Sequence, residues 1–229
     1  MFSPHGGHDQ MNAARHDRYS LMLLISLIVF LILSSFVSEH HLLGDVVLAV
    51  SIYITLVTGT LELSQKRNWR WPGTLLAGIS MLIMVIHFFY ASHLVMVANW
   101  IFLAAFLGFV SVALFSYLGM PGSVTSGRLY GLVSLYLMLG VFYFAIFNFL
   151  EAVHPHSFAE TALPASHEIS RHSLLYLSLI TLTTLGYGDI VPVTPLARLV
   201  AALEATTGVL YIAITVARLV SAYQKEDKK

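Results

Sequence analysis

The segment at residues 181–189 reads Thr-Leu-Thr-Thr-Leu-Gly-Tyr-Gly-Asp and has the composition that a backbone ion-binding site requires. Gly186 and Gly188 stand one residue apart, and glycine adopts positive φ angles at no steric cost. Such a backbone can turn successive carbonyl oxygens toward one axis, where they take the place of the water molecules that a cation loses on entry. Thr184 can add its hydroxyl as the innermost ligand. The alternative is an ordinary glycine-rich turn.

The surroundings of this segment favour the ion-binding alternative over a turn. Residues 173–185 form an apolar stretch of about a dozen residues, between two longer apolar runs, and this stretch is too short to cross the hydrocarbon core of a membrane. We therefore expect a re-entrant segment, with a pore helix at about 170–183 and Ser170 as its N-cap. Its C-terminal end would favour a cation through the helix dipole. Non-helical backbone at membrane depth is tolerated only where protein or water surrounds it.

Residues 184–188 resemble the selectivity filter of tetrameric potassium channels, the pore-loop channels, in a six-helix bacterial-type form without voltage-sensor arginines. The similarity continues through the sequence Gly-Tyr-Gly-Asp-Ile-Val-Pro-Val-Thr at 186–194 and covers about 127–223. Leu185 departs from the family, which more often has Val or Ile there; its carbonyl is unchanged, so we expect selectivity to survive.

The resemblance implies a role for each matching residue. The K⁺ filter would consist of Thr184, Leu185, Gly186, Tyr187 and Gly188, with the side chains of Leu185 and Tyr187 packed backwards against a scaffold. Filter support would come from Thr183, Asp189, Tyr176 and Glu204. The inner helix would bend at Gly208 and line the pore with Val209, Ile212, Val216 and Val220, and Arg198 would anchor the chain to anionic lipid.

Three of the supporting residues have a plainer alternative. Glu204, inside an apolar run, is expected to hydrogen-bond the back of the filter or the pore helix, for instance at Thr181 or Thr183, and to titrate during gating. The alternative is a protonated carboxyl satisfied between helices. Tyr176 is expected to donate to Asp189, which otherwise is a solvated carboxylate at the outer mouth. Arg198 is either a lipid anchor or an ordinary snorkelling arginine.

The composition predicts an all-α integral membrane protein. The 229 residues are 57% hydrophobic and 10% charged, against about 25% charged in soluble domains. Six apolar runs are long enough to span: 21–37, 43–61, 73–90, 94–118, 129–150 and 196–223. A ring of carbonyl ligands needs four filter strands and each chain supplies one, so we expect a homotetramer with cyclic symmetry.

The distribution of basic residues predicts the orientation. With six spans, ten of the 12 Lys and Arg fall on one side, and only Arg171 and Arg198 fall on the other. The positive-inside rule then places both termini in the cytoplasm of a multi-pass protein in the plasma membrane, most simply a bacterial inner membrane. We expect four regions: a cytoplasmic segment at 1–19, a four-helix peripheral domain at 20–126, a pore domain at 127–223 and a short tail at 224–229. Residues 120–127, rich in Gly, Ser and Pro, are the predicted hinge between the two membrane domains.

Several functional classes are disfavoured by the sequence. A net charge of zero argues against a nucleic-acid partner, and no nucleophile, metal or phosphate motif supports an enzyme or an organic cofactor. K⁺ is the expected ion. Residues 71–127 contain no Lys or Arg, so steep voltage gating is not expected, and the short tail leaves no room for a soluble regulatory domain. A poorly selective cation channel and a secondary or potassium-uptake transporter are the alternatives; transporters commonly carry internal repeats, and none is visible.

Overall fold

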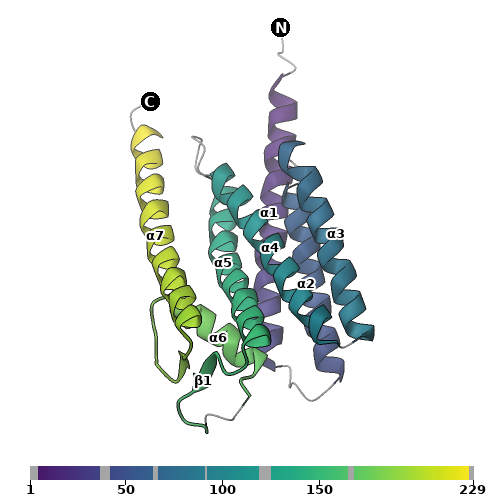
Figure 1. Cartoon of the computed structure of the whole chain (residues 1–229). Coiled ribbons are helices and arrows are strands. Elements are labelled where there is room, and N and C mark those ends of the chain that lie inside the picture. Colours follow the sequence, from purple (N-terminus) through teal and green to yellow (C-terminus); the bar gives the residue numbers. More distant parts are fainter. Residues whose placement is uncertain are drawn as a thin grey trace.

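Helices dominate the structure, a computed structural model that describes residues 5–36, 42–63, 67–90, 92–118, 125–164 and 168–226 (Figure 1). Each predicted apolar run lies within a helix to within one residue at its ends, and the pore helix predicted at about 170–183 corresponds to residues 171–182. The helices are α1 (His5–Phe36), α2 (Leu42–Leu63), α3 (Arg67–Phe89), α4 (His93–Leu118), α5 (Ser126–Val153), α6 (Arg171–Leu182) and α7 (Pro195–Glu226). Two short strands, β1 (Phe158–Glu160) and β2 (Ile190–Pro192), form an antiparallel pair.

Four of these helices are long and apolar enough to cross a membrane, namely α1, α4, α5 and α7. Helices α2 and α3 carry shorter apolar stretches, at Val50–Leu61 and Trp71–His87. The fold is therefore that expected of an all-α membrane protein, while spanning by α2 and α3 stays a prediction. Helix α1 begins at His5, so it extends well into the predicted cytoplasmic segment. The glycine-rich hinge falls largely on residues 119–124, which lie outside the described residues.

Helices α1 to α4 form a bundle that packs on one side of α5, and α7 lies on the other side of α5 (Figure 1). The core of the bundle is apolar, with side chains such as Leu27 and Phe106 almost fully buried. Hydroxyl groups add bonds between helices: Ser26 Oγ lies 3.0 Å from Thr58 Oγ1, and Ser80 Oγ donates to the carbonyl of Phe102 at 3.1 Å. In the single chain, α7 keeps much of its surface exposed. The candidate filter lies between the end of α6 and strand β2, beside this exposed helix.

Candidate functional site

The candidate filter is attached by backbone hydrogen bonds to the C-terminal end of α6. This helix begins as predicted, because the Ser170 hydroxyl caps it by accepting from the backbone N–H of Ser173 at 3.0 Å. At the other end, the N–H groups of Leu185 and Gly186 donate to the carbonyl of Ile180 at 2.8 and 3.2 Å, and the N–H of Thr184 donates to Thr181 at 2.9 Å. These bonds satisfy carbonyls that a helix terminus leaves free, and they fix where the filter segment starts.

The backbone of residues 184–188 alternates in handedness. Thr184, Gly186 and Gly188 have φ angles of 58°, 53° and 78°, whereas Leu185 and Tyr187 stay at negative φ. In a regular strand, successive carbonyl groups point to opposite sides. Here the sign of φ alternates instead, and each change of sign reverses the tilt of the next peptide plane. Successive carbonyl groups can therefore point to the same side. The two glycines adopt this geometry freely. Thr184 is a β-branched residue for which a positive φ is a genuine outlier, and such strain concentrates at functional sites.

The whole filter segment is exposed in the single chain. Residues 183–189 are all solvent-accessible, with Leu185 at 54% and Tyr187 at 69% of full exposure. The expected packing of these two side chains against a scaffold is therefore not provided by the chain's own helices. Irregular backbone at membrane depth must be surrounded by protein or water, and the chain's own helices leave this segment uncovered.

The chain that follows the filter is held by the short sheet. Strand β2 pairs with β1 in the register Glu160↔Ile190 to Phe158↔Pro192. The N–H of Thr161 donates to the carbonyl of Asp189 at 2.8 Å, which extends this pairing to the last residue before β2. Arg198, in the first turn of α7, donates from Nε to the carbonyl of Pro192 at 3.1 Å, so this predicted lipid anchor also links α7 to β2.

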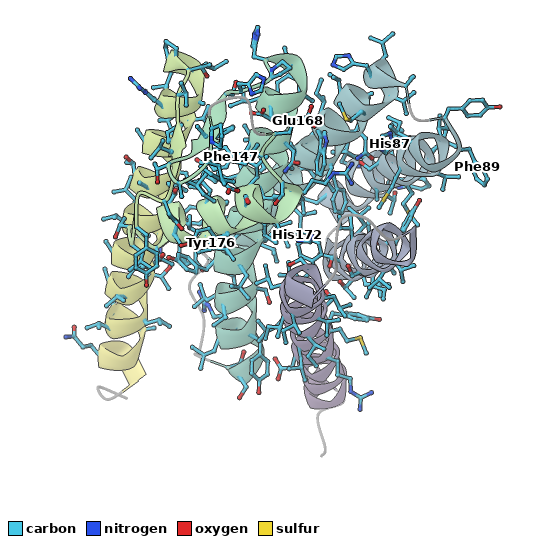
Figure 2. All side chains as sticks on the ribbon, turned by 90° about the horizontal axis from the view of Figure 1, so that it is seen from below. His87, Phe89, Phe147, Glu168, His172 and Tyr176 are labelled. Atoms are coloured by element: carbon cyan, nitrogen blue, oxygen red, sulfur yellow. The ribbon has the colours of Figure 1, made fainter. Side chains whose placement is uncertain are left out.

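The phenol of Tyr176 lies near Asp189, the partner that the sequence predicts for it. Desolvation raises the pKa of Tyr176 above its ordinary value, and a hydrogen bond with Asp189 and the negative charge of that carboxylate raise it further. Figure 2 shows Tyr176 and His172 on the α6 ribbon, seen from the end of the molecule where α6 lies. The contact joins α6 to the residue that follows the filter, and its supporting role for the filter stays a prediction.

Glu204 contacts the pore helix at a residue that the sequence did not indicate. Its Oε1 lies 2.5 Å from the hydroxyl of Ser178, and that hydroxyl lies 2.7 Å from the carbonyl of Gly140 on α5. The specific prediction of Thr181 or Thr183 as the partner is wrong: the Thr183 hydroxyl donates within its own helix to Leu179 at 2.8 Å. Glu204 meets α6 at the level of Ser178, three residues before Thr181 on the same face of the helix.

Tyrosine side chains connect α5 with α6 and α7 beside this contact. The hydroxyls of Tyr143 and Thr207 are 3.0 Å apart, and the Tyr211 hydroxyl donates to the carbonyl of Leu132 at 2.5 Å. The Tyr136 hydroxyl donates to the carbonyl of Leu182, the last residue of α6, at 3.3 Å. Sequence reasoning did not identify these residues, because scattered tyrosines in an apolar helix carry no periodic signal.

Gly208 lies against the end of α6, and α7 continues as a helix through it. A Cβ placed on Gly208 would stand 1.9 Å from the carbonyl oxygen of Leu182. The absence of a side chain at Gly208 therefore permits close contact between α6 and α7. This contact requires a glycine whether or not α7 bends there. The predicted pore-lining residues on α7 share one property in the single chain, which is an exposure near one half: Val209 53%, Ile212 49%, Val216 52% and Val220 51%.

Glu151, at the end of α5, is a further structural residue that the sequence did not indicate. Its carboxylate accepts from the backbone N–H groups of His156 at 2.7 Å, Ser157 at 3.0 Å and Phe158 at 3.3 Å. Glu160, in β1, accepts from the Ser173 hydroxyl on α6 at 2.6 Å. Together these contacts hold the loop between α5 and α6 and fix the strand on which β2 pairs.

Comparison with known proteins agrees with this geometry. Residues 131–225, which contain the filter, most of α5 and all but the last residue of α7, match the ion channel family. The chain is 39% identical over 98 residues to potassium voltage-gated channel subfamily A member 10 of Homo sapiens, covering 43% of this chain and 18% of that protein. It is 33% identical over 100 residues to the voltage-gated potassium channel regulatory subunit KCNF1 of Homo sapiens, again covering 43% and 18%.

A third relative is potassium voltage-gated channel subfamily A member 4 of Homo sapiens, 37% identical over 98 residues, which are 43% of this chain and 14% of that protein. The chain thus spans less than a fifth of the length of the curated relatives it matches. No solved structure matches the chain significantly. The matched domain is that of an ion channel. Residues 131–225 of this membrane protein thus match the ion channel family, and the relatives that they resemble are subunits of potassium channels.

Proposed function

We propose that the chain is one subunit of a homotetrameric channel that conducts K⁺ passively and selectively. The observation that carries the proposal is the alternating backbone at 184–188, held at the C-terminal end of α6 in a chain of the potassium channel family. Four such segments around one axis would present rings of carbonyl oxygens that replace the hydration shell of the ion. The Thr184 hydroxyl would add the innermost ligand.

The exposed surfaces support assembly from four copies. Leu185 and Tyr187 are uncovered in the single chain, and so are the apolar residues Val209 and Val216 on α7. In the proposed tetramer the filter side chains pack against neighbouring subunits, and the α7 residues face the pore. In this arrangement the chain begins with a cytoplasmic segment at residues 1–19, which is followed by a peripheral domain at 20–126. The pore domain follows at residues 127–223, and a tail follows at 224–229. The protein lies in the plasma membrane with both termini in the cytoplasm, and Arg198 meets anionic headgroups.

Selective conduction is tested by the reversal potential of the purified protein in planar bilayers with K⁺ on one side and Na⁺ on the other. The proposal expects a reversal potential close to the equilibrium potential of K⁺. A value near zero would instead identify a poorly selective cation channel, and a flux that saturates and requires a second coupled ion would identify a transporter. Protein-free bilayers are the control.

The proposed channel should depend at most weakly on voltage. The fourth helix, α4, carries no Asp, Glu, Lys or Arg, whereas steep gating needs about 3–4 charges per subunit on a sensor helix. We expect a conductance–voltage relation equivalent to less than about one charge per subunit. The measurement is macroscopic conductance over a wide range of potentials. A steep relation that persists when the filter is mutated would contradict this expectation, because a steep relation arising in the filter would disappear with the mutation.

The α7 stripe should be accessible to water from the cytoplasmic side. In Ile212→Cys and Val216→Cys channels, small water-soluble thiol reagents should reduce the current, and the reaction should be faster when the channel is open. The sequence has no cysteine, so reaction elsewhere is excluded. Leu107→Cys, at a position 1% exposed in α4, is the matched unreactive control. Failure of both positions to react in a conducting channel would remove α7 from the pore, and equal rates in open and closed channels would place the gate at the filter.

A further inference from the structure

Glu204 is a buried carboxyl at the junction of three helices. It has no exposed surface, and it lies within the membrane-spanning helix α7. Its Oε1 contacts Ser178 of α6, and Ser178 contacts the carbonyl of Gly140 on α5. Its second oxygen, Oε2, has no hydrogen-bond partner among the described residues. The group is therefore bound to the scaffold of the filter through one oxygen.

The number of hydrogens in this contact fixes the protonation state of the carboxyl. A carbonyl oxygen only accepts, and a serine hydroxyl has a single hydrogen to donate. If Ser178 donates to Gly140 at 2.7 Å, its oxygen must accept the hydrogen that lies in the 2.5 Å contact with Glu204. If Ser178 donated to a carboxylate instead, two oxygens would face each other across 2.7 Å with no hydrogen between them. Two full hydrogen bonds among these three oxygens need two hydrogens, so the geometry favours a neutral Glu204 that supplies the second.

Among the described residues no cation faces Glu204 to stabilise its charged form. The elements that pack most closely on α7 are α5, α6 and β2, and α4 meets it farther along, where Arg218 lies over the ring of Phe115. Tyr136 of α5 is near enough to interact electrostatically with Glu204, and the other nearby phenols are bonded elsewhere, Tyr143 to Thr207 and Tyr211 to Leu132. Tyr176 of α6 pairs with Asp189 before β2. The other ionisable side chains of these elements are at or near helix ends: Arg128, Tyr130, Glu151, Arg171, His172, Arg198, Arg218, Tyr223, Lys225 and Glu226.

We propose that Glu204 is a proton-binding site that holds α7 against α6 behind the filter, and that loss of its proton releases this contact and lowers K⁺ conduction. A buried carboxylate without a paired charge is strongly unfavourable, so deprotonation must be relieved by movement of α7 away from α6 or by entry of water. Both outcomes weaken the support of a filter that is joined to the end of α6. Glu204 acts through the scaffold and contacts no ion, so it is a positioning residue. The inference rests on the proposed function for its effect on conduction only.

The test compares K⁺ flux at neutral pH with flux at the most alkaline pH at which the assembly stays intact. We expect the wild-type flux to fall at least about fivefold, the lower end of ordinary coupling between two sites. In Glu204→Gln, whose amide donates to Ser178 at every pH, the ratio of the two fluxes should stay close to one. Glu168→Gln, the same chemical change at an exposed position, should retain the wild-type fall. The proposal would be overturned if the wild-type flux stayed constant or rose at alkaline pH. It would also be overturned if the flux of Glu204→Gln fell as much as that of the wild type.

A second readout does not depend on conduction. The infrared carbonyl band of a protonated carboxylic acid should be present in the wild-type protein in lipid, absent in Glu204→Gln and shifted in Ser178→Ala, where the hydrogen-bond partner is lost. The band should disappear over the pH range in which flux falls. Absence of the band at neutral pH would refute the neutral carboxyl. A protein that shows the band and conducts no K⁺ at neutral pH would instead refute the proposed channel function and leave the proton site intact.

Discussion

Replacing Gly186 or Gly188 with alanine is expected to abolish K⁺-selective current. The two residues have φ angles of 53° and 78°. An L-residue in this region of the backbone is less stable by roughly 1–2 kcal/mol, because its Cβ crowds the following carbonyl. A proposed tetramer would carry this strain four times around a single ring of ligands. The peptide planes would turn away from the axis, and the carbonyls would no longer match the hydration shell of the ion.

The measurement is the reversal potential of each variant across a K⁺/Na⁺ gradient, where we expect discrimination to drop at least about tenfold, the factor that corresponds to 1.4 kcal/mol. The strain arises from φ, because among the described residues no atom beyond the two chain neighbours lies within 4 Å of either Cβ position. Gly78→Ala is the matched control: Gly78 is helical and its Cβ position is equally open. Unchanged selectivity in both filter variants would refute the filter assignment.

The sequence predicts best those features that depend on local rules. Ser170 caps α6 because a serine before an apolar helix satisfies its free N–H groups, and this needs no knowledge of the rest of the fold. The two positive-φ glycines follow from the same kind of rule. The positive φ of Thr184 does not, because a β-branched residue avoids this region. The hydrogen bonds between 184–186 and the last turn of α6 hold it there.

Contacts between distant segments could not be predicted from local patterns. The pairing of β1 with β2 joins two strands of three residues, too short to show an alternating pattern, across about thirty residues of chain. The partner of Glu204 depends on how α6 lies against α7. Ser178 and Thr181 are three residues apart and share a face of α6, so the height at which Glu204 meets this face selects between them, whereas Thr183 lies on a different face. The Glu151 carboxylate accepts from three backbone groups of a loop whose path no sequence pattern specifies.

The second large effect is expected at Gly208, where alanine should destabilise the folded protein. The added Cβ would lie 1.9 Å from the carbonyl oxygen of Leu182 and 2.9 Å from its carbonyl carbon, both backbone atoms that cannot turn aside. The Leu182 carbonyl is further held by the Tyr136 hydroxyl at 3.3 Å. Helix α7 must therefore move away from α6. Overpacking of this kind costs about 1–3 kcal/mol, and the rigidity of the neighbour places Gly208→Ala at the upper end, about 3 kcal/mol per chain.

The measurement is thermal unfolding of the purified protein in detergent, with Gly78→Ala as the control. Gly78 is also helical but has open space at its Cβ position, so alanine there should leave the midpoint unchanged or raise it, since alanine favours a helix over glycine by up to about 1 kcal/mol. The comparison separates two reasons for a glycine at 208. If Gly208 serves only as a bend, Gly208→Ala should unfold like Gly78→Ala and alter channel opening alone. If the contact with Leu182 is required, only Gly208→Ala should lower the midpoint, because only there does a methyl group meet backbone.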